Sequence, residues 1–130
     1  MSFSDPIADL LTRIRNASRA KHRYVDVWRT KIKESLVVVL QEAGFVDGFL
    51  VDEEKKKMRI FLKYAKGRQS LVEELVRVSS PSLRRYIGYK EIPEIDGGMG
   101  LVILSTPEGI LDGKTARRKK VGGELLCFVR

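Results

Sequence analysis

Gly113, Lys114 and Thr115 form the sequence GKT downstream of an apolar run, as at the end of a phosphate-binding P-loop. In that motif the lysine holds a triphosphate and the threonine hydroxyl binds magnesium. The first glycine of the motif is replaced by Glu108, whose charge would repel a triphosphate. Only 15 residues follow Thr115, too few for the helix and strand that complete such a site. The sequence therefore argues against nucleotide binding.

The chain has few other residues that could catalyse a reaction or bind a metal. His22 is the only histidine and Cys127 the only cysteine, so neither a Ser-His-Asp arrangement nor a zinc cluster is indicated. Cys127 lies in the apolar run LLCFV, where we expect a small buried side chain, and a lone cysteine suits a reducing compartment. Two carboxylate pairs at helical spacing are explained by helix capping; they are Asp5 with Asp9 and Glu91 with Glu94. We expect no enzyme, cofactor or metal.

The basic side chains indicate a polyanionic partner. The chain has 25 lysines and arginines against 17 acidic residues, a net charge of +8 and an isoelectric point near 9.8. Residues 1–64 hold 13 basic and 9 acidic residues, and the remainder 12 and 8, so each half carries +4. Between Arg13 and Lys33 eight basic residues are opposed only by Asp26. We expect that segment to face phosphate groups.

Length and hydropathy set further bounds. A chain of 130 residues can bury one modest core or two small ones. No apolar stretch approaches the twenty residues that cross a bilayer, and the N-terminal residues lack the basic patch and apolar run of a secretory signal. We expect a soluble protein with no membrane partner.

The first half of the chain predicts an α-β-α-β-β order. Asp5 and Pro6 begin a helix that runs to about Ala20, with Arg13, Arg15 and Arg19 off its apolar stripe. That stripe has the helical spacing i, i+3, i+4, i+7 and consists of Ile7, Leu10, Leu11 and Ile14. The next elements are a strand at 24–28, a helix from Thr30 to Gly44, and a hairpin of residues 45–51 and 58–64 with the tip DEEKKK.

The second half has weaker patterns. Residues 65–70 are polar and predict a linker, whereas the spacing in LVEELVRV (71–78) slightly favours a helix over a strand. LVIL at 101–104 is apolar on both faces, so it predicts a fully buried central strand. The other expected elements are a turn at 79–82, a basic strand at 83–87, a short basic helix at 112–120 and a final strand at 124–129.

Three blocks in one order resemble the small-subunit ribosomal protein S8 family of bacteria. The blocks are DPIADLLTRIRNA near the start, RVS and LRRY in the middle, and GMGLVILSTPEGIL followed by AR and VGGELLCFV. The resemblance covers nearly the whole chain. It implies an α+β fold of two abutting units, residues 1–66 as an N-terminal α-β-α-β-β unit and 67–130 as a mainly β RNA-binding unit with a short helix. It also implies a strand at 71–78.

The resemblance further implies direct binding to the central domain of small-subunit ribosomal RNA. It also implies that the protein helps to assemble the subunit's platform early, contacts neighbouring small-subunit proteins, and represses translation of its own messenger. A cytoplasmic or organellar ribosome would be the location. In the family, a Ser-Thr loop after the central strand reaches into the RNA minor groove, which matches Ser105 and Thr106 here; hydroxyls can read 2′-hydroxyls and base edges there.

Further RNA-binding candidates surround that loop. Glu124, beside Gly122 and Gly123, either holds the loop or accepts hydrogen bonds from RNA. Tyr86 either contacts RNA or packs its ring in the core with its hydroxyl exposed to water. The candidates for phosphate contact are Arg84, Arg13 and Lys31.

The loop departs from the family pattern, because Pro107 and Glu108 stand where serine and lysine are usual. The exchange removes a hydroxyl and replaces a cation by an anion, which predicts weaker RNA binding. Two other classes stay open: a general basic nucleic-acid binder, which would bind any duplex and lose affinity in parallel as salt rises, and a nucleotide-binding enzyme dependent on Lys114.

Overall fold

The computed structural model describes residues 5–130, so residues 1–4 of the predicted first unit lie outside the described part. The predicted α+β class is confirmed, with an N-terminal α-β-α-β-β part and a mainly β C-terminal part with a short helix. The main elements are α1 (Pro6–Arg19), β1 (Tyr24–Trp28), α2 (Lys31–Glu42), β2 (Val46–Asp52), β3 (Lys57–Leu62), β4 (Tyr64–Ala65), β5 (Gln69–Ser70), β6 (Leu75–Arg77), β7 (Tyr86–Ile87), β8 (Leu101–Thr106), β9 (Gly109–Asp112), α3 (Gly113–Arg118) and β10 (Gly123–Val129).

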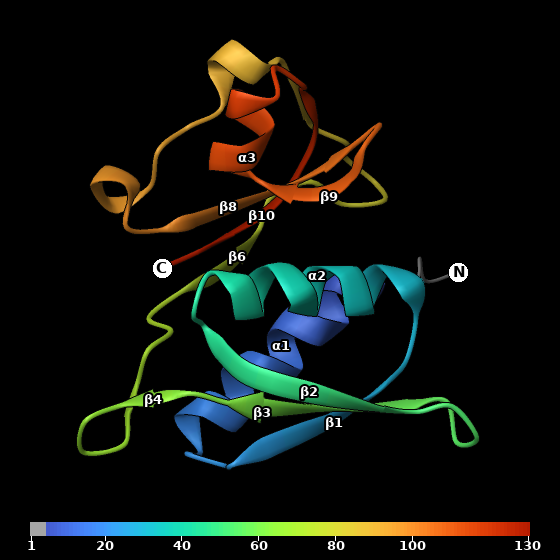
Figure 1. Cartoon of the computed structure of the whole chain (residues 1–130), viewed down its shortest axis with the longest axis vertical. Coiled ribbons are helices and arrows are strands. Elements are labelled where there is room, and N and C mark those ends of the chain that lie inside the picture. The colour runs from blue at the N-terminus through green and yellow to red at the C-terminus, as the bar shows by residue number, and fades with distance from the viewer. Residues whose placement is uncertain (1–4) are drawn as a thin grey trace.

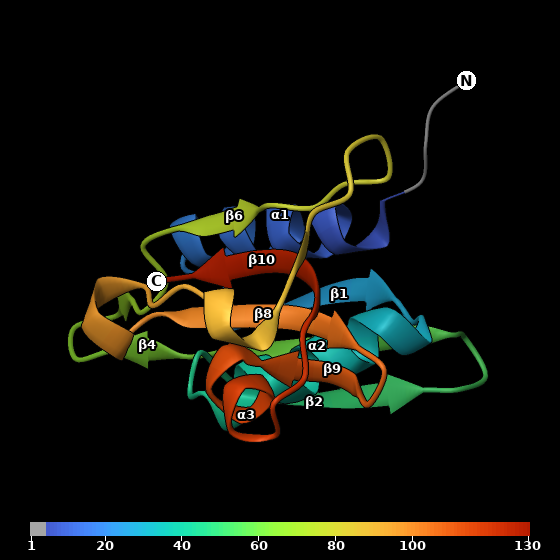
Figure 2. The ribbon, with the colours of Figure 1, turned by 90° about the horizontal axis from the view of Figure 1, so that it is seen from above.

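Helices α1 and α2 form a middle layer between two antiparallel sheets (Figure 1). The first sheet has the order β1-β3-β2, and its outer face carries no helix. The second has the order β6-β10-β8-β9, with β7 paired to the start of β10. Helix α3 packs on β8, on the side of the second sheet away from α1 and α2 (Figures 1 and 2).

The N-terminal helices begin and end where the sequence predicts. The Asp5 carboxylate accepts a hydrogen bond from the Ala8 amide at 3.1 Å, and the Thr30 hydroxyl accepts one from the Lys33 amide at 3.2 Å. Gly44, just after α2, has a φ of +84°, which glycine adopts at little cost. The predicted apolar stripe of α1 is buried throughout. Capping and burial together fix both helices.

Strand β8 has the central, fully buried position predicted for LVIL. Its four apolar residues are all buried, and they alternate between two clusters. Leu101 and Ile103 belong to the main core, which also includes α1, α2 and the first sheet, whereas Val102 and Leu104 pack in a smaller cluster with Ala116 of α3. The strand therefore needs apolar residues on both faces.

Three segments differ from the expectations drawn from local pattern. The helix favoured for residues 71–78 is wrong: the segment contains β6, which pairs with β10, as the family resemblance implies. The expected linker at 65–70 is a small hairpin of β4 and β5. The expected strand at 83–87 is shorter, because only Tyr86–Ile87 pairs with β10.

Within residues 5–130, each helix is too short or too polar to cross a lipid bilayer.

Candidate RNA-binding site

Three of the predicted site residues form one row across the second sheet. Ser105 of β8 lies opposite Glu124 of β10, and Glu124 lies opposite Tyr86 of β7. Directly opposed residues of antiparallel strands point to the same face, so the three side chains are neighbours. Sheet pairing thus brings together residues that are far apart in the sequence.

The two hydroxyls of the predicted loop are not equivalent. The Thr106 hydroxyl donates to the Gly109 carbonyl at 2.8 Å and accepts from the Glu108 amide at 3.1 Å. Its single hydrogen is therefore used within the turn. The Ser105 side chain is half-buried, and its hydroxyl makes no hydrogen bond within residues 5–130 and is not sealed from solvent. Ser105 is the hydroxyl that can donate to a ligand.

The turn between β8 and β9 consists of Pro107 and Glu108. Gly109 closes it with a φ of +107°, and a Cβ there would have nothing within 4 Å. The backbone at Gly109 is thus open to close approach. The Glu108 carboxylate lies 3.8 Å from the Lys119 ammonium, so its negative charge is partly offset. The expected weaker binding of this loop stays a prediction.

Glu124 holds a different loop from the one expected. Its carboxylate accepts hydrogen bonds from the Ser79 hydroxyl and from the Arg84 guanidinium, the latter at 2.9 Å. These bonds fasten the segment between β6 and β7 to β10. Burial alone would raise the pKa of the Glu124 carboxyl, but the bonds from Ser79 and Arg84 outweigh it and hold the pKa below its ordinary value. The side chain is therefore an ionised anchor within the site.

Ser79 is a site residue that sequence reasoning missed. It is fully buried, and besides donating to Glu124 its hydroxyl accepts from the Arg85 amide at 3.1 Å. The sequence placed Ser79 in a turn, and no local signal marks a serine that will meet a carboxylate from a strand 45 residues away.

Gly122 and Gly123 have a packing role. A Cβ on Gly122 would lie 2.4 Å from the Ile87 carbonyl oxygen, and one on Gly123 would lie 2.1 Å from the Ser105 carbonyl oxygen. Both neighbours are backbone atoms, which cannot turn away. The two glycines therefore allow β7 and β8 to approach β10 beside the row.

Tyr86 and Arg84 face solvent. Tyr86 is 70% exposed, so the alternative of a core tyrosine is wrong. The Arg84 side chain is 48% exposed although it is paired with Glu124. A ring and a planar guanidinium beside a hydroxyl suit stacking and phosphate contact.

The other two predicted phosphate contacts lie on the N-terminal part. Arg13 is half-exposed and forms an ion pair with Asp9 at 3.2 Å. Asp9 also forms an ion pair with the buried Lys33 at 3.1 Å. Lys31 is exposed, at the first position of α2, with no ion pair in the described part of the chain. The start of α2 and the β8–β9 turn lie at the same end of the molecule in Figures 1 and 2.

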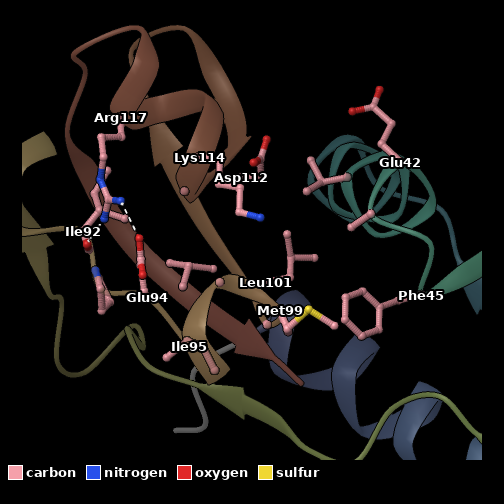
Figure 3. A pocket seen from close by; sticks show the side chains of 17 residues that line it. Glu42, Phe45, Ile92, Glu94, Ile95, Met99, Leu101, Asp112, Lys114 and Arg117 are labelled. Carbon is pink, nitrogen blue, oxygen red and sulfur yellow. Dashed lines mark hydrogen bonds and ion pairs between the residues drawn. The ribbon is translucent and has the colours of Figure 1, made fainter.

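The GKT sequence does not form a phosphate site. It begins α3, whose first turn is capped by Asp112: the carboxylate accepts from the Thr115 amide at 3.2 Å and from the Thr115 hydroxyl. An anion of the chain thus occupies the place of a phosphate. Lys114 points into a pocket of about 260 Å³ between α2, α3 and residues 92–102, with Phe45 and Leu101 on its wall (Figure 3).

Cys127 is fully buried, and burial raises the pKa of its thiol to about 12. Residues 5–130 contain no group of three or more histidine, cysteine, aspartate or glutamate side chains placed to hold a metal ion.

The α+β fold carries a polar row of a hydroxyl, a carboxylate and an aromatic ring, with an arginine paired to the carboxylate, and these are features of a binding protein. Comparison with known proteins identifies the family to which this binding protein belongs. Residues 5–130 match the family model described as Ribosomal protein S8.

The chain is similar to curated proteins named Small ribosomal subunit protein uS8. It is 53% identical to that of Chlamydia felis over 128 residues, 97% of this chain and 96% of the relative. It is 48% identical to that of Protochlamydia amoebophila over 132 residues, covering 99% of both chains. The chain belongs to the ribosomal protein S8 family, and it is a structural protein, not an enzyme.

Proposed function

We propose that the chain is a structural constituent of the small ribosomal subunit that binds the central domain of its ribosomal RNA directly and helps to assemble the platform. Membership of the ribosomal protein S8 family supports this role, as do the names of the relatives. The observation on which the RNA contact rests is the row of Ser105, Glu124 and Tyr86 across three strands.

In this proposal each member of the site has its own part. The Ser105 hydroxyl donates to a 2′-hydroxyl or a base edge in the RNA minor groove, where acceptors are displayed. Tyr86 stacks on or hydrogen-bonds to an unpaired nucleotide. Arg84 contacts phosphate while Glu124 and Ser79 fix its loop, and Arg13 and Lys31 add phosphate contacts. Thr106 shapes the turn and retains a lone pair that can accept from a 2′-hydroxyl.

The remaining parts of the proposal follow from the family. The protein works in a cytoplasmic or organellar ribosome, touches neighbouring small-subunit proteins, and represses translation of its own messenger.

Ser105→Ala tests the recognition step. The variant loses one donor, which costs about 1 kcal/mol, roughly fivefold in affinity for a central-domain stem. Affinity for a scrambled stem of the same length should be unchanged, since phosphate contacts dominate there. Both are measured by filter binding at physiological salt.

Ser35→Ala is the matched control, because Ser35 is exposed on α2 and its side chain makes no hydrogen bond within residues 5–130. It should bind both stems as the original chain does. Equal affinity of the original chain for the two stems would reduce the protein to a general basic binder, and a Ser105→Ala variant with full preference would remove Ser105 from the site.

A further inference from the structure

A pocket lies at the beginning of β8, whereas Ser105 lies near the end of the same strand. It has a volume of about 260 Å³ and is enclosed by α2, α3 and residues 92–102 (Figure 3). We call it the α2–α3 pocket. Its apolar wall consists of Val39, Phe45, Ile95, Met99 and Leu101. Residues from both halves of the chain thus form one concave surface.

The apolar wall of the α2–α3 pocket suits an aromatic ring. Phe45 is half-buried and packs against the main core, whereas Met99 is 85% exposed. Figure 3 shows the Met99 side chain reaching toward the Phe45 ring. Aromatic rings pack well against one another in offset or edge-to-face contacts, and a thioether sulfur favours the edge of a ring. A ring that contacted both side chains would remove apolar surface from water.

Lys114 gives the pocket a cation. Its side chain points into the pocket from the first turn of α3 (Figure 3). Two other cations of this segment, Arg117 and Lys119, form ion pairs with carboxylates. Lys114 forms no ion pair and no side-chain hydrogen bond within residues 5–130. An ammonium beside apolar side chains attracts an anion more strongly than one in bulk water, because the local dielectric constant is lower. Lys114 is therefore available to a negatively charged group.

The three carboxylates around the pocket leave Lys114 available. The Asp112 carboxylate caps α3 through its hydrogen bonds from Thr115. Glu94 forms an ion pair with Arg117 at 3.4 Å. The Glu42 carboxylate points away from Lys114 (Figure 3). The pocket thus combines an apolar wall with one unpaired ammonium.

We propose that the α2–α3 pocket binds a small aromatic carboxylate, with its ring against Phe45 and Met99 and its carboxylate on the Lys114 ammonium. The volume of about 260 Å³ lies just below the roughly 300–1,000 Å³ of most ligand pockets, so it suits a molecule with a single ring. A phosphate group alone would leave the apolar wall unused. The inference goes beyond the proposed function and does not depend on it, since the pocket and Ser105 lie at different ends of β8.

The test uses the full chain and hydrocinnamate, a phenyl ring joined to a carboxylate by two methylene groups. Titration calorimetry should give a dissociation constant on the order of 1 mM or tighter. Hydrocinnamyl alcohol has the same ring without the charge, and it should bind about tenfold more weakly because the charged hydrogen bond is lost. Inorganic phosphate should not compete with the acid. Saturating acid should also raise the urea midpoint, because it binds only the folded chain.

Two variants separate the parts of the pocket. Lys114→Gln should weaken binding of the acid about tenfold and leave binding of the alcohol unchanged. Met99→Ser removes an exposed side chain, so the fold should tolerate it, and it should weaken the acid and the alcohol alike. Arg118→Gln is the matched control: Arg118 is exposed on α3, has no ion pair in the described part of the chain, and its replacement changes the net charge equally. This control should bind the acid as the original chain does.

Several outcomes would overturn the proposal. They are equal affinities for the acid and the alcohol, unchanged binding of the acid by Lys114→Gln, and equal losses in Lys114→Gln and Arg118→Gln. A short peptide ending in phenylalanine that bound more tightly than hydrocinnamate would point instead to the end of a protein as the occupant, and would also overturn it. Preference for the central-domain stem should be the same in all three variants, so this result and that of Ser105→Ala can be told apart.

Discussion

At the residue scale, Glu124 fixes through its carboxylate a loop beside the row of residues that we propose for RNA binding. Its carboxylate is bonded to Ser79 and Arg84, and its own strand position sets it between Ser105 and Tyr86. The sequence left two roles open for this residue. Its hydrogen bonds support a holding role, but for the segment between β6 and β7 instead of the Ser-Thr loop. A strand residue can only be assigned such a role once its neighbours across the sheet are known.

The Glu124 anchor makes a prediction about acid stability. The pKa of its carboxyl is lower in the folded chain than the ordinary value of 4.5, so the unfolded chain binds more protons at acidic pH. The stabilisation is complete above that ordinary value and is lost as the pH falls through the lower folded value. The free energy of unfolding of Glu124→Gln should therefore fall less steeply below about pH 4.5 than that of the original chain.

Urea unfolding at several pH values between 7 and 3.5 measures this difference. Other carboxylates with lowered pKa, such as Asp9 and Asp26, keep their contribution in both chains. Parallel curves for the two chains at acidic pH would show that the Glu124 bonds do not stabilise the fold.

At the element scale, the helices and the N-terminal hairpin could be predicted because their signals are local. Caps at Asp5 and Thr30, apolar spacing and a charged turn each act within a few residues. Strand β6 could not, because its backbone pairs with β10, about 50 residues away, and that pairing overrides the helical spacing of LVEELVRV. Arg15 was expected to face outward, yet it donates to the Leu75 carbonyl of β6 and so helps to bind α1 to the second sheet.

The features of the site could likewise be predicted from the sequence only in part. The resemblance implied Ser105 and Thr106, and the chemistry of Tyr86 and Glu124 made these two further candidates. The internal use of the Thr106 hydroxyl and the buried bridge at Ser79 depend on turn geometry and on strand pairing. Neither leaves a pattern in the order of residues.

Gly123→Ala tests the close approach of β10 and β8. The added methyl would lie 2.1 Å from the Ser105 carbonyl oxygen, so the strands must move apart, which costs about 1–3 kcal/mol. The urea midpoint should fall, and RNA affinity should fall with it because Ser105 moves. Gly88→Ala is the control: a Cβ there has nothing within 4 Å and its φ is −80°, so its stability should stay within about 0.5 kcal/mol of the original. Equal midpoints for the two variants would contradict the assigned role.

At the scale of the whole molecule, the two predicted units share one core. The main cluster joins Leu10 and Leu36 of the helices and Ile60 of the first sheet to Ile103 and Leu126 of the second. A boundary near residue 66 therefore divides the sequence, but the buried core contains residues from both sides of that boundary. We expect both halves to unfold in a single transition.

Two natural probes check this expectation, one in each half. Trp28 is the only tryptophan and lies in β1, whereas the buried Cys127 lies in β10 and becomes reactive only when the second sheet opens. Tryptophan fluorescence and thiol labelling should give the same urea midpoint. Midpoints that differ clearly would show two independently folding units.

The place of β10 in its sheet has a consequence for synthesis. This strand follows β6 and β8 in the chain yet lies between them, so both partners are synthesised before the strand that joins them. A product terminated before residue 123 would lack the link between these strands and the anchor of the Tyr86 loop. An incomplete copy would therefore lack the assembled row of Ser105, Glu124 and Tyr86 that we propose for RNA recognition.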